Sequence, residues 1–227
     1  MKVNNTERVP LELLSDAQAE LANGLNSLGG RNNDGLRDEF PFYMVVHINR
    51  AAEGFLFLKK ADRIDASRLL VRPAIEAMIK LSAVNKDASL LYRIAYTERI
   101  DDGKWIRPAQ KAADFDAEDE KAWQQFTQAY VTKFPNHKLA ETRLSLFDAA
   151  TTAGLDGFYN SHYRLYCKFT HAAFTAVTGV LDHTHYEDNE AVMACTLCGL
   201  ETIRALGGDV PNLKSLFDRL SEACGVT

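Results

Sequence analysis

Apolar side chains recur at helical spacing along almost the whole chain, and this periodicity limits the fold more than any other feature. Residues three and four positions apart share one face of an α-helix, so the pattern predicts amphipathic helices that pack through their apolar faces. No hairpin signal and no alternating run of useful length stands between turn residues. The sequence therefore predicts an all-α protein built as a multi-helix bundle.

Prolines, glycines and capping residues divide the chain into separate helices. Pro10 precedes the first helix, and the turn cluster Leu28–Gly35 ends it. Asp65 is expected to cap the third helix, and Pro73 is expected to kink that helix or delay its start. Beyond the first helix, the pattern predicts helices at about Pro41–Lys60, Ala66–Val84, 88–113, 117–132, 138–150, Phe158–Leu181, Asn189–Leu206 and Asn212–Leu220.

The length of 227 residues suits one large domain. The chain is 46% hydrophobic and 25% charged, which is ordinary for globular proteins and excludes disordered and fibrous classes. The turn cluster is the best linker candidate. We therefore expect residues 1–35 to form an N-terminal helical arm with its linker, and residues 36–227 to form a single globular unit.

Charge and cysteine content restrict the partners and the compartment. The formal net charge is −5, which argues against a protein that coats nucleic acid non-specifically but permits a local basic cleft. Four cysteines are few for a chain of this length, and we expect them to be reduced thiols. The most apolar stretch, Phe40–Leu58, contains Arg50 and Glu53, and the N-terminus lacks the pattern of a signal peptide. We expect a cytoplasmic protein without membrane contact.

Several catalytic classes lack their motifs in this sequence. There is no glycine-rich phosphate loop, no nucleophile elbow and no HExxH helix, which argues against nucleoside triphosphatases, α/β-hydrolases and zincins. Cys195 and Cys198 have metal-like spacing, but their helical context favours small buried thiols. His183 and His185 stand beside acids, yet the sequence fixes no third ligand. We expect neither a metal nor a cofactor.

The long helix predicted from Phe158 carries the most informative pair of residues. Seven positions separate Arg164 from His171, so two helical turns place both side chains on one face, about 10 Å apart along the axis. Asn160 falls on the same stripe, and the opposite side is apolar. An arginine binds phosphate well, and a histidine can transfer a proton near neutral pH. The alternative is that both residues lie on a solvated face or bridge to acids.

Charged residues also recur at spacing four along the predicted third helix: Arg68, Arg72, Glu76 and Lys80. The remaining residues of this helix are mostly apolar, so we expect Arg72 and Glu76 at the edge of the core, within reach of the long helix and paired with each other or with that helix. Two interpretations stay open, a structural ion pair and a direct role in binding substrate.

These motifs resemble the HEPN superfamily, the higher eukaryotes and prokaryotes nucleotide-binding domains. Arg164, six residues and then His171 on a late helix are similar to its Arg-x4-6-His motif, and Arg72-Pro-Ala-Ile-Glu76 with Tyr163 resembles an uncharacterised bacterial branch. The similarity spans roughly Phe40–Leu206. It implies a helical bundle that often dimerises.

The resemblance implies metal-independent cleavage of RNA, in which the 2′-hydroxyl attacks the adjacent phosphate. His171 would be the general base or acid, Arg164 would hold the phosphate, and Asn160 would add a hydrogen bond. It also implies a homodimer and, for a toxin or phage-defence protein, an antitoxin-like partner. Leu165 stands where such nucleases usually carry a polar residue. An inactive module that binds a nucleotide or a protein is therefore the alternative function.

Overall fold

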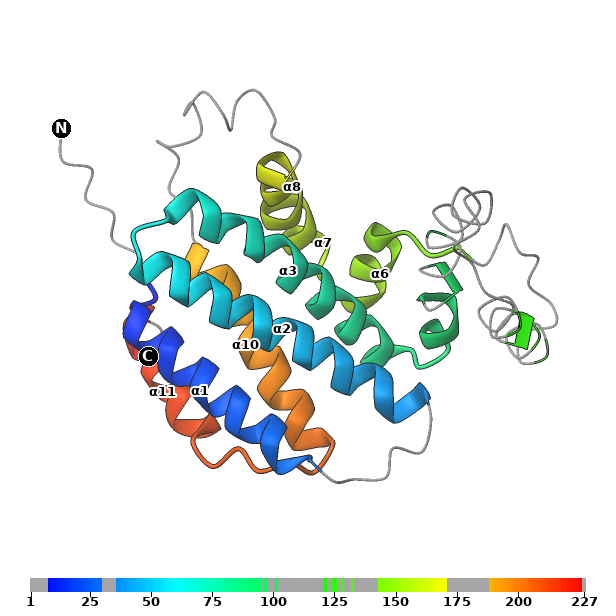
Figure 1. The fold of residues 1–227 in the computed structure, drawn as a ribbon, viewed down its shortest axis with the longest axis horizontal. Coiled ribbons are helices and arrows are strands. Elements are labelled where there is room, and N and C mark those ends of the chain that lie inside the picture. Colours follow the sequence, from blue (N-terminus) through cyan, green and yellow to red (C-terminus); the bar gives the residue numbers. More distant parts are fainter. Residues whose placement is uncertain are drawn as a thin grey trace.

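The structure is a computed structural model in which every regular element among the described residues is helical. It describes residues 8–29, 36–94, 96–97, 143–170 and 188–225, and isolated residues between 101 and 132. The predicted all-α, multi-helix bundle is confirmed (Figure 1). The helices are α1 (Leu11–Ser27), α2 (Leu36–Lys60), α3 (Ile64–Lys86), α6 (Leu146–Ala153), α7 (Asp156–Phe158), the π-helix η1 (Tyr159–Tyr163), α8 (Arg164–Thr170), α10 (Asp188–Ala205) and α11 (Leu213–Ala223).

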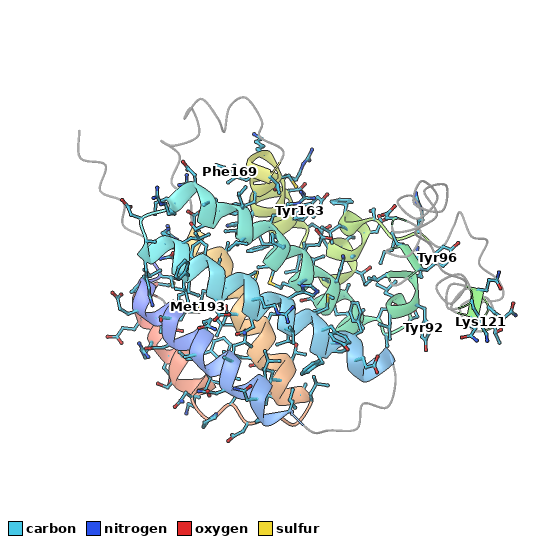
Figure 2. The ribbon with its side chains drawn as sticks, in the orientation of Figure 1. Tyr92, Tyr96, Lys121, Tyr163, Phe169 and Met193 are labelled. Carbon is cyan, nitrogen blue, oxygen red and sulfur yellow. The ribbon has the colours of Figure 1, made fainter. Side chains whose placement is uncertain are left out.

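The helix α3 is the centre of the arrangement. It packs along α2 on one side, against α10 within the bundle, and against α6 and α8 on its other side (Figure 1). The helix α10 lies among α1, α2 and α3, and Met193 on α10 lies near the middle of the bundle (Figure 2). Burial of apolar surface stabilises a fold by about 25 cal/mol per Å². The apolar contacts among these helices are therefore the main stabilising contribution. The largest fully buried apolar side chains include Leu14, Leu21, Ile48, Phe55, Ile75, Ile79, Leu81, Met193, Leu200 and Ile203.

Two prolines lie inside helices: Pro41, which was predicted to begin a helix, and Pro73, which was predicted to lie within one. The helix α2 begins at Leu36 and contains Pro41, and α3 begins at Ile64 and contains Pro73. Asp65 lies in the first turn of α3, whose capping position is Arg63. A proline removes one backbone hydrogen bond, and burial of the apolar faces on both sides of it outweighs that loss. The predicted starts at Pro41 and Ala66 were therefore too late.

The helix α6 is shorter than predicted. It begins at Leu146 because Ser145 forms a capping box with Asp148, in which the Asp148 backbone N–H donates to Ser145 Oγ over 3.1 Å. It ends at Gly154, whose φ of 73° is the left-handed conformation that glycine adopts without strain. The predicted helices at 88–113 and 117–132 lie largely outside the described residues.

The helix α1 contributes Leu14 and Leu21 to the same core as α2, α3 and α10. It is joined to the C-terminal helix by Glu20, which is 6% exposed and accepts hydrogen bonds of 2.9 Å from the backbone and the side-chain nitrogen of Asn212. The boundary expected after residue 35 falls in residues outside the described part and stays a prediction. Within the described ranges, no helix combines the length and apolarity that crossing a bilayer requires.

Candidate functional site

The segment that carries Arg164 is not a uniform α-helix. A single π turn, η1, stands between α7 and α8, and Arg164 is the first residue after it. A π turn closes its hydrogen bonds between residues five apart, and such turns occur often at functional sites. The stripe expected from α-helical spacing therefore changes register between Asn160 and Arg164. His171 lies outside the described residues, so the expected juxtaposition of Arg164 and His171 stays a prediction.

The two faces of η1 and α8 differ in burial. Tyr163 and Tyr166 are buried, at 9% and 1% exposure, whereas Asn160 and Arg164 are exposed. No side chain in the described part of the chain forms an ion pair or hydrogen bond with Arg164. Lys168, one turn later, is exposed as well. This helix therefore holds the bundle with its tyrosines and presents a cationic edge to solvent.

Arg72 approaches the buried face of this segment from α3. Its Nη2 donates a hydrogen bond to Tyr163 Oη over 3.5 Å, and its guanidinium carbon lies 5.7 Å from the centroid of the same ring. Figure 2 shows Tyr163 where the η1–α8 segment crosses α3. Burial, together with the nearby charge of Glu76, raises the pKa of Tyr163 to about 12, so the phenol is neutral at physiological pH. The structure brings these two predicted supporting residues into contact.

Tyr163 also ends a row of aromatic rings that reaches α6. The ring centroids of Tyr159 and Tyr163 are 5.0 Å apart with an interplanar angle of 23°, and Phe147 on α6 meets Tyr159 edge-on with a centroid distance of 5.3 Å. The row connects α6, η1 and, through Arg72, α3. The helix segment just before Arg164 is thus fixed on two sides.

Glu76 does not pair with Arg72 as expected. Its Oε1 accepts a hydrogen bond from Lys80 Nζ over 2.9 Å, while Arg72 contacts Tyr163. Glu76 lies one turn from each cation, and a glutamate that precedes a lysine by four residues is the favoured order on a helix. Sequence spacing alone did not distinguish between the two partners.

This pairing predicts a small effect for Glu76→Ala on stability. The side chains of Glu76 and Lys80 are 35% and 18% exposed, so water screens part of their attraction. We expect the free energy of unfolding, measured by urea denaturation, to fall by less than about 1 kcal/mol. A loss of about 3 kcal/mol, the size expected for an unpaired buried charge, would show that Arg72 depends on Glu76 after all.

Among the described residues, the most buried charged side chain was not singled out by the sequence. Asp188, the first residue of α10, is 1% exposed. Its Oδ1 accepts a 2.6 Å hydrogen bond from Tyr166 Oη, and its Oδ2 accepts a 3.1 Å bond from Arg68 Nε. Lys59 Nζ lies 3.6 Å from the same Oδ2. One carboxylate therefore connects α2, α3, α8 and α10.

Arg68 and Tyr166 are both held on several sides in this cluster. Arg68 Nη1 also bonds to Asp65 over 3.3 Å, and its guanidinium carbon lies 5.4 Å from the centroid of the Phe169 ring. Burial, and then the charge of Asp188, raises the pKa of Tyr166, which keeps its phenol protonated as a donor. The spacing of charged residues along α3 indicated from the sequence that Arg68 belongs to a charged stripe. Nothing in the sequence pairs it with Asp188, which is 120 residues away.

A cavity of about 510 Å³ opens at the other end of the α3 stripe, between α3, the residues Ile94, Thr97 and Asp101, and the start of α6. Tyr92 and Tyr96 mark this end of the molecule in Figure 2. Its volume is typical of small-molecule sites. The lining residues are Glu76, Lys80, Ile94, Thr97, Asp101, Leu144, Ser145, Leu146 and Ala149.

The cysteine pair on α10 lies in the core. Cys195 is fully buried, and Cys198 is half-buried with its Sγ 3.6 Å from Ser82 Oγ. Burial raises the pKa of both thiols, which keeps them protonated. In the described part of the chain, no group of three or more histidine, cysteine or acidic side chains is placed to hold a metal ion. His183 and His185 lie outside that part.

Residues 38–190, about two thirds of the chain, match the model of DUF5677, which is described as a family of unknown function. The chain belongs to the DUF5677 family. The matched range of this family contains α3, η1 and α8, and so includes Arg72, Glu76, Tyr163, Arg164 and His171. No curated protein and no solved structure matches the chain detectably. The resemblance to the HEPN superfamily stays a prediction.

Proposed function

We propose that the protein is a HEPN-like, metal-independent endoribonuclease of the toxin or phage-defence type. The observation that supports this most directly is the position of Arg164, which is exposed and has no charged partner in the described part of the chain. An unpartnered guanidinium is available for two hydrogen bonds to a phosphate. The buried tyrosines on the other face hold its helix in place.

The chemistry follows from an arginine and a histidine beside one phosphate. His171 acts as general base or general acid: as a base it removes the proton from the 2′-hydroxyl, whose oxygen attacks the adjacent phosphorus, and as an acid it gives a proton to the 5′-oxygen of the next nucleotide as the bond from phosphorus to that oxygen breaks. Arg164 stabilises the negative charge that develops on the phosphate oxygens, and Asn160 adds a hydrogen bond. In this proposal two protomers form a homodimer in which both Arg164 and His171 pairs face one cleft.

The proposal is tested by incubating the purified protein with structured and unstructured RNA in the presence of EDTA. We expect cleavage to persist in the chelator, because no protein group in the mechanism requires a metal. The products should end in a 2′,3′-cyclic phosphate, because the attacking oxygen belongs to the substrate. Intact RNA at neutral pH, with and without a divalent metal, would overturn the nuclease proposal.

A module that binds without turnover is the second candidate function. Leu165, which is half-buried, stands next to Arg164 where a polar residue would assist catalysis, and an exposed arginine suits binding as well as cleavage. The same assay separates the two candidates when a gel-shift measurement accompanies it. RNA or a nucleotide that is bound but never cut would favour the module. Binding that declines steeply with salt would identify phosphate as the group recognised.

A further inference from the structure

The outer side of α2 carries exposed side chains along most of the helix. The other sides of α2 pack against α1, α3 and α10, and Figure 1 shows α2 running between α1 and α3. Phe57, at 72% exposure, and Tyr43, at 55%, are the two most exposed large hydrophobic side chains among the described residues. Single exposed apolar residues are common on soluble proteins, so the pattern in which these two stand decides what they mean.

Residues on this side of α2 recur at the spacing of the a and d positions of a coiled coil. The first series, at intervals of seven, is Tyr43, Arg50 and Phe57, and the second, three positions later in each case, is Val46, Glu53 and Lys60. All are exposed except Val46, which is half-buried. Because seven residues make nearly two turns, both series lie on one face of α2 and follow it for about 26 Å.

The two charges at the middle of this face have no partner within the protomer. In the described ranges, the side chain of neither Arg50 nor Glu53 forms an ion pair or a hydrogen bond. The helix therefore presents one unpaired cation and one unpaired anion, with an exposed aromatic ring on either side of them along its axis. Such a surface is suited to a partner that carries the same charges in the reverse order.

A second copy of α2 meets this requirement when the two helices run antiparallel. A parallel pair related by a two-fold axis would place Arg50 against Arg50 of the partner subunit, and Glu53 against Glu53 of the partner subunit. An antiparallel pair brings the first series of one helix against the second series of the other. In the register that puts Arg50 opposite Glu53 of the partner subunit, the remaining positions also match.

The same register provides contacts for both exposed aromatic rings. Phe57 lies opposite Val46 of the partner subunit, so an apolar ring meets an apolar side chain. Tyr43 lies opposite Lys60 of the partner subunit, and an ammonium group beside an aromatic face is attracted to it. Every contact occurs twice in a two-fold dimer, so one register pairs all the members of both series.

We propose that the outer face of α2 is an antiparallel two-fold interface between two copies of this chain. The interface covers Phe57 and gives Arg50 and Glu53 the partners that they lack within one protomer. Neither Asn160 nor Arg164 lies on α2, so this face is separate from the cationic edge. The proposal concerns the contact between copies and does not rest on RNA cleavage.

Sedimentation velocity of the full chain without RNA, at concentrations up to about 0.1 mM, should show a reversible dimer. Arg50→Glu and Glu53→Arg should each weaken dimerisation at least about tenfold, because each places like charges at both copies of the central contact. An equimolar mixture of these two variants should regain the affinity of the parent, because every central contact in the mixed dimer again joins opposite charges. The double variant, with both substitutions in one chain, should regain it for the same reason.

Lys214→Glu is the matched control, since it makes the same change of charge at an exposed position on α11 and should leave dimerisation unchanged. Phe57→Ala should weaken the dimer at least about tenfold, with circular dichroism unchanged because the ring is exposed in the protomer. The assignment is wrong if the parent is a monomer at every concentration, if the charge variants dimerise like the parent, or if their mixture fails to restore the dimer. Because no RNA is present, these results are independent of the cleavage assay that tests the nuclease proposal.

Discussion

Replacing His171 with alanine is expected to lower the rate of RNA cleavage by about 10²- to 10⁴-fold, the contribution of a positioned general acid or base. Arg164→Ala should lower it by about 10²- to 10³-fold, since it removes a group that stabilises charge on the phosphate. Because Arg164 is exposed, its replacement should change the free energy of unfolding by less than about 0.5 kcal/mol. Initial cleavage rates and urea denaturation of the same samples measure both effects.

Arg219→Ala is the matched control for this experiment. Arg219 is 46% exposed on α11, far from α8, and its loss changes the net charge equally. Figure 1 shows α11 beside α1, on the opposite side of α2 and α3 from α8. A cleavage rate that falls as much for Arg219→Ala as for Arg164→Ala would show that only general electrostatic attraction is involved. A His171→Ala variant that cuts as fast as the parent would contradict the assigned chemistry.

Replacing Asp188 with alanine is expected to cost about 3–5 kcal/mol of stability, because it leaves Arg68 and Lys59 near the core without their buried anion. Tyr166→Phe removes a single hydrogen bond to a charged group and should cost about 1.5–3 kcal/mol. Urea denaturation measures both losses. The m value should stay constant if the variants expose the same surface area on unfolding as the parent.

A double-mutant cycle tests whether these residues act together. The losses for Asp188→Ala and Tyr166→Phe should sum to more than the loss of the double variant, because both remove the same hydrogen bond. Asp218→Ala on the surface of α11 is the control and should cost less than about 0.5 kcal/mol. If Asp188→Ala lowers the free energy of unfolding no more than this control does, the carboxylate does not stabilise the packing of α2, α3, α8 and α10.

The helical pattern was readable from the sequence because it depends on local residues. The first helix ended at the predicted turn, and α10 and α11 lie close to their predicted ranges, since each end is marked by glycine, proline or polar residues. Pro41 misled the prediction of where α2 begins, because local sequence does not reveal how much apolar surface a helix buries, whereas the helix predicted across Pro73 is present. The exposure of Arg164 agrees with the polar stripe assigned to the long helix, whereas the burial of Tyr163 was not predicted.

The connections between distant residues were not readable in the same way. Asp188 meets Arg68 and Tyr166 only after four helices have packed, and no spacing rule relates positions 120 residues apart. Glu76 had two cations within one turn, and the tertiary contact of Arg72 with Tyr163 decided between them. The π turn also escaped prediction, because periodicity arguments assume one constant number of residues per turn.

The π turn has a consequence for how this segment can change over evolutionary time. A helix takes in one extra residue by widening a single turn, and every side chain after the insertion rotates by about 100° relative to those before it. In this chain the rotation falls between the rings of Tyr159 and Tyr163 and the residues from Arg164 onward, which include both the exposed Arg164 and the buried Tyr166. Loss of one residue from this turn would therefore rotate Arg164 and Tyr166 together relative to the aromatic row, so the length of the turn sets the direction of the cationic edge and of the Tyr166–Asp188 hydrogen bond at once.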